Sequence, residues 1–182
     1  MLGPQELKDP LEVSMIFDLT ITQFTKMLHN LDTMLDKGAQ YADHKKFDTT
    51  VLMNSRLAPD QFPLTRQIQI ACDTAKLAAH RLTTKEAPSH PDTEATWADL
   101  RTRIQDTIKY LGTFTAKDFE TAATRQITQP RWEGKWMTGE EFVLNHAVPN
   151  FYFHVTTAYT IMRHNGVEIG KKDYLGQMPY KK

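Results

Sequence analysis

Apolar residues recur at alternating steps of four and three along the first part of the chain after Met15. The positions are Phe17, Ile21, Phe24, Leu28, Leu31 and Leu35. This spacing places them on one face of an α-helix, because an α-helix turns once every ~3.6 residues. The pattern predicts a long first helix with a stop near Gly38.

A second amphipathic helix is predicted from about Pro63 to Leu82, after a connection over residues 43–62. Asp60 is placed to cap this helix, and Pro63 to lie in its first turn. The apolar face is formed by Ile68, Cys72, Ala75, Ala79 and Leu82. A polar stripe with the same steps of three and four lies beside it, formed by Arg66, Gln69, Asp73, Lys76 and His80.

Prolines mark a loop over residues 87–91, and a third helix is predicted after it, capped by Asp92 or Thr93. The apolar face of that helix is Trp97, Leu100, Ile104, Ile108 and Leu111. A short helical turn is expected over residues 116–123. Loose alternation around residues 133–134 then favours a small β-hairpin.

The last helix is predicted to begin at Thr138, because Thr138 and Glu141 form a Thr-x-x-Glu capping box. It continues to Asn165-Gly166, a pair typical of a helix C-terminus. Pro149 lies inside this span, so the helix either kinks there or begins anew there.

Four amphipathic helices, with a long crossover and a small hairpin before the last helix, predict an all-α four-helix bundle. We expect one domain over residues 15–176. Residues 1–14, which have two prolines and no apolar periodicity, are interpreted as a flexible N-terminal extension, and residues 177–182 as a C-terminal tail.

Composition narrows the function classes. The 182 residues include 22 basic and 22 acidic side chains, so the formal net charge is zero and we expect no nucleic-acid partner. No apolar run approaches the ~20 residues that a membrane helix needs, so no membrane association is expected. A single cysteine excludes an internal disulfide and a cysteine-rich zinc module. With no secretory signal and one free thiol, the expected location is cytoplasmic.

The segment around the last predicted helix carries the most candidate chemistry. Asn150 and His154 are four residues apart, so they project from one face about one turn apart. Two histidines at this spacing hold a metal, but an asparagine is a poor ligand for zinc-type ions. The alternative is a buried histidine satisfied by a neighbouring polar group. His146, two turns earlier and beyond Pro149, is expected to be structural or exposed.

A polar pocket is the second hypothesis. A solvated charged face is the default explanation for the polar stripe of the second helix. If the second and fourth helices are neighbours, however, Gln69 and Asp73 line one pocket with Asn150 and His154. Cys72, on the apolar face, is expected to be an inert buried thiol.

Two strings carry a family resemblance: RLAPDQFPLTRQIQIACDTAK (56–76) and PNFYFHVTTAYTIMRHNGVEIGKKDYLG (149–176). They resemble an uncharacterised family of domains of unknown function that is grouped with the DinB/YfiT-like metalloenzymes. The resemblance covers residues 15–176, nearly the whole chain. It implies a DinB-like four-helix bundle and a homodimer.

The wider superfamily holds a divalent metal with three histidines, one on the second helix and two on the last. Placed on this chain, those positions fall on His154, on Asn150 and near Gln69, the last within about one turn. Two of the three depart from the pattern, so we expect no metal and no other cofactor. The resemblance leaves a polar pocket with Asp73, Lys76 and Tyr152 as neighbours.

The sequence therefore favours a DinB-like bundle with a degenerate metal site that binds an unknown small molecule or acts as a homodimeric scaffold. The alternative is an enzyme of the metal- or thiol-dependent transferase or isomerase type. In that enzyme His154, together with Asp73, would perform acid–base or metal-assisted chemistry, because the pKa of a histidine lies near neutrality.

Overall fold

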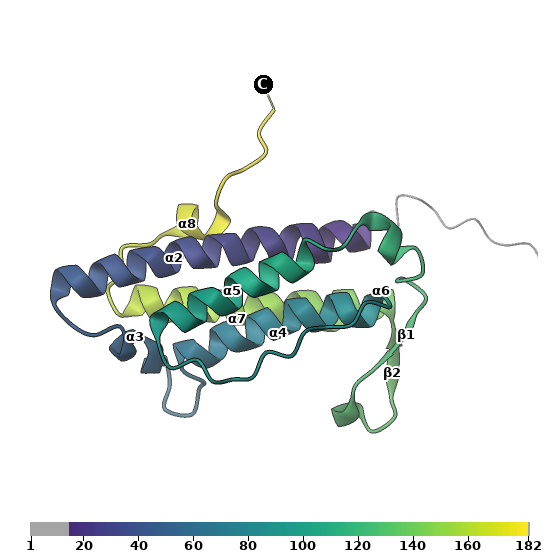
Figure 1. Ribbon diagram of the computed structural model, residues 1–182, viewed down its shortest axis with the longest axis horizontal. Coiled ribbons are helices and arrows are strands. Elements are labelled where there is room, and N and C mark those ends of the chain that lie inside the picture. The colour runs from purple at the N-terminus through teal and green to yellow at the C-terminus, as the bar shows by residue number, and fades with distance from the viewer. Residues whose placement is uncertain (1–14, 182) are drawn as a thin grey trace, which may run out of the picture.

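The computed structural model describes residues 15–181, and the extension expected over residues 1–14 lies outside them. Four long helices form a bundle: α2 (Gln23–Lys45), α4 (Leu64–Leu82), α5 (Trp97–Leu111) and α7 (Val148–His164). Helix α4 packs between α5 and α7, and α2 packs against the same two helices from the opposite side (Figure 1). The predicted all-α bundle with a small hairpin is confirmed.

The first helix is longer than predicted. A π-helical turn, η1 (Asp18–Thr22), leads into α2, which ends at Lys46 in a left-handed conformation with φ of 62°. Gly38 is buried inside α2, so the predicted stop there is wrong. A Cβ at Gly38 would lie 2.8 Å from a ring carbon of Trp97, and the glycine therefore serves close packing rather than termination.

The start of α4 also differs from the prediction. A short helix, α3 (Thr50–Asn54), fills the connection after α2, and the N-cap of α4 is Pro63, with no side-chain cap. Asp60 lies in a turn before it and is exposed, so the predicted cap at Asp60 is wrong. The first turn of α4 is tied down by its backbone instead, since the Leu64 N–H donates to the Ser55 carbonyl at 3.0 Å.

The long crossover of the bundle runs over residues 83–96, between α4 and α5. Figure 1 shows it running back along the bundle, which lets α4 and α5 point the same way. Helix α5 begins at Thr96, whose hydroxyl accepts the Asp99 N–H while the Asp99 carboxylate accepts the Thr96 N–H. The cap predicted at Asp92 or Thr93 is therefore three or four residues too early.

The predicted hairpin is confirmed. After the 3₁₀ turn η2 (Ala116–Phe119), strands β1 (Gln126–Thr128) and β2 (Trp136–Thr138) pair antiparallel, with Ile127 opposite Met137. A 3₁₀ turn, η3 (Pro130–Trp132), lies between them. The hairpin is held at the end of the bundle where the last helix begins (Figure 1).

The last helix is built in three parts: α6 (Gly139–Phe142), the π-helical turn η4 (Val143–Ala147), and α7. The capping box predicted at Thr138 and Glu141 is present. Pro149 lies in the first turn of α7, where η4 has already changed the hydrogen-bonding pattern. The predicted end at Asn165-Gly166 is confirmed, and Gly166 has a φ of +95°.

The core runs the length of the bundle. It is filled by fully buried aliphatic and aromatic side chains, among which Phe24 of α2 stacks on Phe151 of α7 with ring centroids 4.1 Å apart. A short helix, α8 (Lys171–Leu175), packs on α2, and no helix follows it up to residue 181. Within residues 15–181, none of the helices has the length and apolar character needed to cross a membrane.

Candidate functional site

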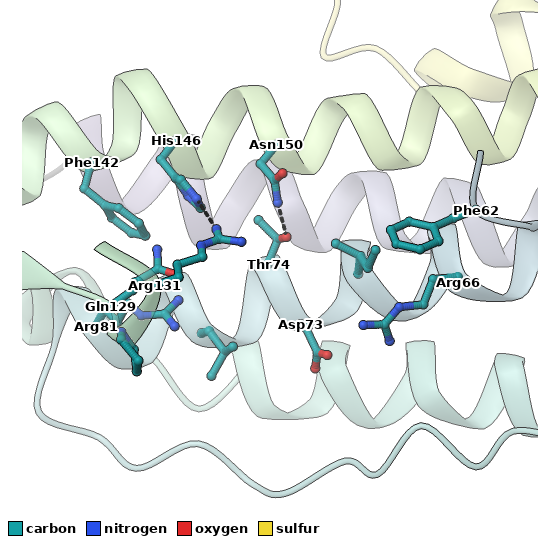
Figure 2. A pocket seen from close by; sticks show the side chains of 13 residues that line it. Phe62, Arg66, Asp73, Thr74, Arg81, Gln129, Arg131, Phe142, His146 and Asn150 are labelled. Atoms are coloured by element: carbon teal, nitrogen blue, oxygen red, sulfur yellow. Dashed lines mark hydrogen bonds between the residues drawn. The ribbon is translucent and has the colours of Figure 1, made fainter. Parts of the chain in front are cut away.

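A groove of about 460 Å³ runs along the seam between α4 and the last helix. Helix α4 supplies a face spaced by three and four residues, and the last helix supplies residues spaced by four. The hairpin closes one end of the groove (Figure 2). The lining residues are Phe62, Arg66, Ile70, Asp73, Thr74, Leu77, Arg81, Gln129, Pro130, Arg131, Phe142, His146 and Asn150.

The hairpin end of the groove is rich in hydrogen-bond donors. Arg131, from η3, donates through Nη2 to Nε2 of His146 at 2.7 Å. Because a guanidinium only donates, His146 accepts at Nε2 and is neutral, with its proton on Nδ1. Burial lowers the pKa of His146 below its usual value, and the positive charges of Arg131 and Arg81 lower it further.

Two further donors converge at this end. Gln129 is 8% exposed, and its Nε2 has no acceptor. Arg81, from the last turn of α4, makes no ion pair or side-chain hydrogen bond with any residue over 15–181. Burial lowers the pKa of Arg81, and so does the charge of Arg131. Figure 2 shows the side chains of Arg81, Gln129 and Arg131 gathered together.

The middle of the groove is bridged by a neutral hydrogen bond. Asn150 of α7 donates through Nδ2 to Oγ1 of Thr74 on α4 at 2.7 Å (Figure 2). At the far end, Arg66 lies over the ring of Phe62 at 5.9 Å, and its guanidinium is paired with Asp92 of the crossover. The far end is therefore aromatic and its cation is neutralised.

His154 lies deep between the same two helices and is paired with a residue that the sequence did not single out. Its Nδ1 donates to Oε1 of Gln67 at 2.7 Å, and Nε2 of Gln67 donates to the Phe62 carbonyl at 3.0 Å. Burial, with a contribution from the charge of Arg66, lowers the pKa of His154 to about 4. The imidazole is therefore neutral at physiological pH.

Gln69 does not face His154. Its Nε2 donates to Glu94 at 2.7 Å, and its Oε1 accepts from Arg66 at 3.1 Å. The two glutamines are two residues apart, which is about 200° of helical rotation, so they project from opposite sides of α4. The prediction that Gln69 lies opposite His154 is therefore wrong. Gln67, on the other side of α4, takes that place.

The structure also separates the other expected pocket residues. The Asp73 carboxylate borders the groove, but it is paired with Lys76 at 3.0 Å and with Arg103 of α5 at 2.9 Å. Lys76 is buried in that pair. Tyr152 is half-buried near Tyr174 of α8 and does not line the groove; burial raises its pKa, and so does Tyr174. Only Asp73 and Asn150, of the six expected residues, line the groove.

The residues at the superfamily's metal positions do not fit a three-histidine site. Gln67 and Asn150 offer neutral amides beside the single imidazole of His154, and the Asn150 amide already donates to Thr74. Within residues 15–181, no group of three or more His, Cys, Asp or Glu side chains is arranged to hold a metal ion. Burial also raises the pKa of the Cys72 thiol to about 12, so it stays protonated.

Sequence reasoning missed the cationic end of the groove. Arg81 continues the spacing of Ile70, Thr74 and Leu77 along α4, which is a usable signal. His146 is four residues before Asn150. It lines the groove because η4 joins α7 without a break at Pro149, so the two residues stay on one continuous helix. Gln129 and Arg131 reach the groove only through the tertiary placement of the hairpin.

Comparison with known proteins assigns the fold to a family. Residues 16–175 match the family model described as Domain of unknown function (DUF1993). The chain is 57% identical to a protein of Shewanella denitrificans whose 1.83 Å crystal structure is described as that of a DinB family member. The two align with a TM-score of 0.93 over 96% of this chain and 99% of that one. No match was found among the curated proteins.

Proposed function

Because the chain belongs to the DUF1993 family and has a DinB-like helical fold, we propose that it is a small-molecule-binding protein whose ligand lies in the α4/α7 groove without a metal. One observation carries this proposal. The amide nitrogen of Gln129 is buried at the groove wall with no acceptor, although buried polar groups are nearly always hydrogen-bonded. A ligand atom supplies the missing partner.

The shape of the groove supports the same conclusion. A volume of about 460 Å³ falls within the ~300–1,000 Å³ typical of small-molecule sites. Ile70, Leu77 and Phe142 give apolar contact along the groove, and Thr74 and Asn150 add polar groups between them. Such a combination of apolar walls and a few polar groups binds and orients a small ligand.

The enzyme alternative has weaker support. A general base works best with a pKa near the operating pH, whereas the pKa of His154 is lowered to about 4. Asp73 is committed to Lys76 and Arg103 and makes no hydrogen bond with His154. The homodimer expected from the resemblance stays a prediction, which light scattering at micromolar concentration tests.

A neutral apolar dye tests the groove itself. We expect N-phenyl-1-naphthylamine to bind the wild-type protein with enhanced fluorescence, and Leu77→Trp to weaken binding at least about tenfold because the indole fills the groove. Ile108→Trp is the matched control, since Ile108 is also half-buried but lies on α5 away from the groove. Equal dye binding by the wild type and Leu77→Trp, or no binding by the wild type, contradicts the proposal.

A further inference from the structure

The hairpin end of the groove holds two guanidinium groups without a counter-charge. Arg81 makes no ion pair or side-chain hydrogen bond within residues 15–181, and the hydrogen-bond partner of Arg131 is the neutral imidazole of His146. By contrast, Arg101 is paired with the buried Asp32 and the half-exposed Asp36. The fold therefore neutralises Arg101 but leaves Arg81 and Arg131 without an acidic partner.

Arg81 is placed at an electrostatic cost. Burial removes part of its hydration, and the nearby Arg131 adds repulsion; both effects lower its pKa. Asp73, the acidic residue of the groove lining, is engaged by Lys76 and Arg103 and lies apart from Arg81 in Figure 2. An anion between Arg81 and Arg131 would remove this repulsion.

The remaining polar groups at this end are donors as well. Nε2 of Gln129 is buried without an acceptor, in a side chain that is only 8% exposed. Nδ1 of His146 carries the proton, since Nε2 accepts from Arg131, and it too is buried without a partner. The donors of Arg81, Gln129 and His146 that have no protein acceptor, together with the remaining N–H groups of Arg131, match the oxygens of an oxyanion.

We propose that Arg81, Arg131 and Gln129 form a subsite for the doubly negative oxyanion of a phosphate monoester, whose organic part lies along Leu77 and Ile70 toward Phe62. The inference rests on the proposed function, because it names the class of ligand for that groove. Two uncompensated guanidinium charges match the charge of a phosphate monoester near neutral pH better than the single charge of a carboxylate.

Calorimetric titration tests the subsite with three probes: phenyl phosphate, inorganic phosphate and benzoate. We expect phenyl phosphate to bind the wild type most tightly, because it combines the oxyanion with an apolar ring. Arg81→Gln and Arg131→Gln should each weaken its binding about tenfold to a hundredfold, the usual effect of losing a charged hydrogen bond. Added salt should weaken wild-type binding as well.

Two controls separate this inference from the proposed function. Arg125→Gln, on a partly exposed arginine that does not line the groove, should leave phenyl phosphate binding unchanged. Binding of the neutral dye by the wild type tests the groove independently of the subsite, because the dye has no oxyanion. If dye binds but phenyl phosphate does not, or if Arg81→Gln and Arg131→Gln bind phenyl phosphate as the wild type does, the subsite is wrong and the groove function stands. Tighter binding of benzoate than of phenyl phosphate overturns the phosphate assignment.

Discussion

The arginines on the two sides of helix α4 differ in whether they have acidic partners. Toward α5, the buried Arg103 is surrounded by Asp73, Asp92 and Glu94, each within 3.1 Å of its guanidinium. Toward α7, Arg81 is partly buried beside another cation. A buried charge is normally neutralised within the fold, so the first side is structural and the second is prepared for something outside the chain.

The crossover explains why the α5 side is so heavily paired. Residues 83–96 lie across α4 and α5 and contain little secondary structure, so side chains must hold them. Arg66 pairs with Asp92, Gln69 donates to Glu94, and Arg103 pairs with both acidic residues. The polar stripe of α4 thus holds the crossover in place, and only its Arg66 and Asp73 also border the groove.

Removing the buried cation on the α5 side should have the largest effect. Arg103→Met leaves Asp73, Asp92 and Glu94 facing one another without their common partner, and we expect a loss of about 3 kcal/mol in unfolding free energy. Urea unfolding near neutral pH measures it. Lys37→Met, at the half-exposed ion pair with Asp173, should cost less than about 1 kcal/mol. Equal effects of the two variants would contradict a structural role for the α5 side.

The pH dependence of stability tests the α7 side. Burial lowers the pKa of His154 from its ordinary value of 6.5 to about 4 in the native state. Between these two pH values the unfolded chain binds a proton at His154 that the native state does not bind. The contribution of His154 to the free energy of unfolding is therefore fully present above about pH 6.5. It falls as the pH is lowered toward 4, by up to ~3 kcal/mol.

Urea unfolding of the wild type and His154→Asn at both ends of that window isolates the contribution. The wild type should lose more stability on acidification than the variant does. The pKa values of His90 and His146 are also lowered, but both residues are present in the two proteins and cancel in the comparison. Parallel losses would show that His154 does not stay neutral in the native state.

The smallest change in the free energy of unfolding is expected at Arg81, and the sign of this change is what distinguishes it from Arg103. Arg81→Met removes a desolvated charge that faces Arg131, so stability should be unchanged or rise by up to about 1 kcal/mol. Thermal unfolding of this variant beside Arg103→Met gives the direct contrast. A loss of more than about 1 kcal/mol at Arg81 would remove the distinction between the two sides of α4.

The sequence was sufficient where one local signal decides the structure. The spacing of Phe24, Leu28 and Leu31 determines a helix, and Thr138 with Glu141 determines where another begins. The stop predicted near Gly38 is wrong because a glycine that ends a helix cannot be told by sequence from one that makes room for an indole ring. Only the position of Trp97 in space separates the two.

The candidate site was harder for a geometric reason. Gln67 and Gln69 are both polar, and α4 is packed on one side by α7 and on the other by the crossover and α5. Which glutamine meets His154 depends on the rotation of α4 about its axis, which the sequence does not show. Asn150 and Asp73 do line the groove, and their role in binding a ligand stays a prediction. Gln129 and Arg131 belong to a hairpin whose docking no local pattern specifies.

The two π-helical turns determine where along the chain the groove tolerates a change in length. Segments η1 and η4 pack against each other at the hairpin end, and each carries more residues per turn than an α-helix. A π-helical turn accommodates one extra residue, so deleting one residue of η4, such as Asn145, would restore the α-helical count with little rotation of α6 relative to α7. The hairpin would then keep its place, and with it Gln129 and Arg131. The same deletion within the regular part of α7 would instead turn everything before it by about 100° and take His146 and Asn150 off the groove.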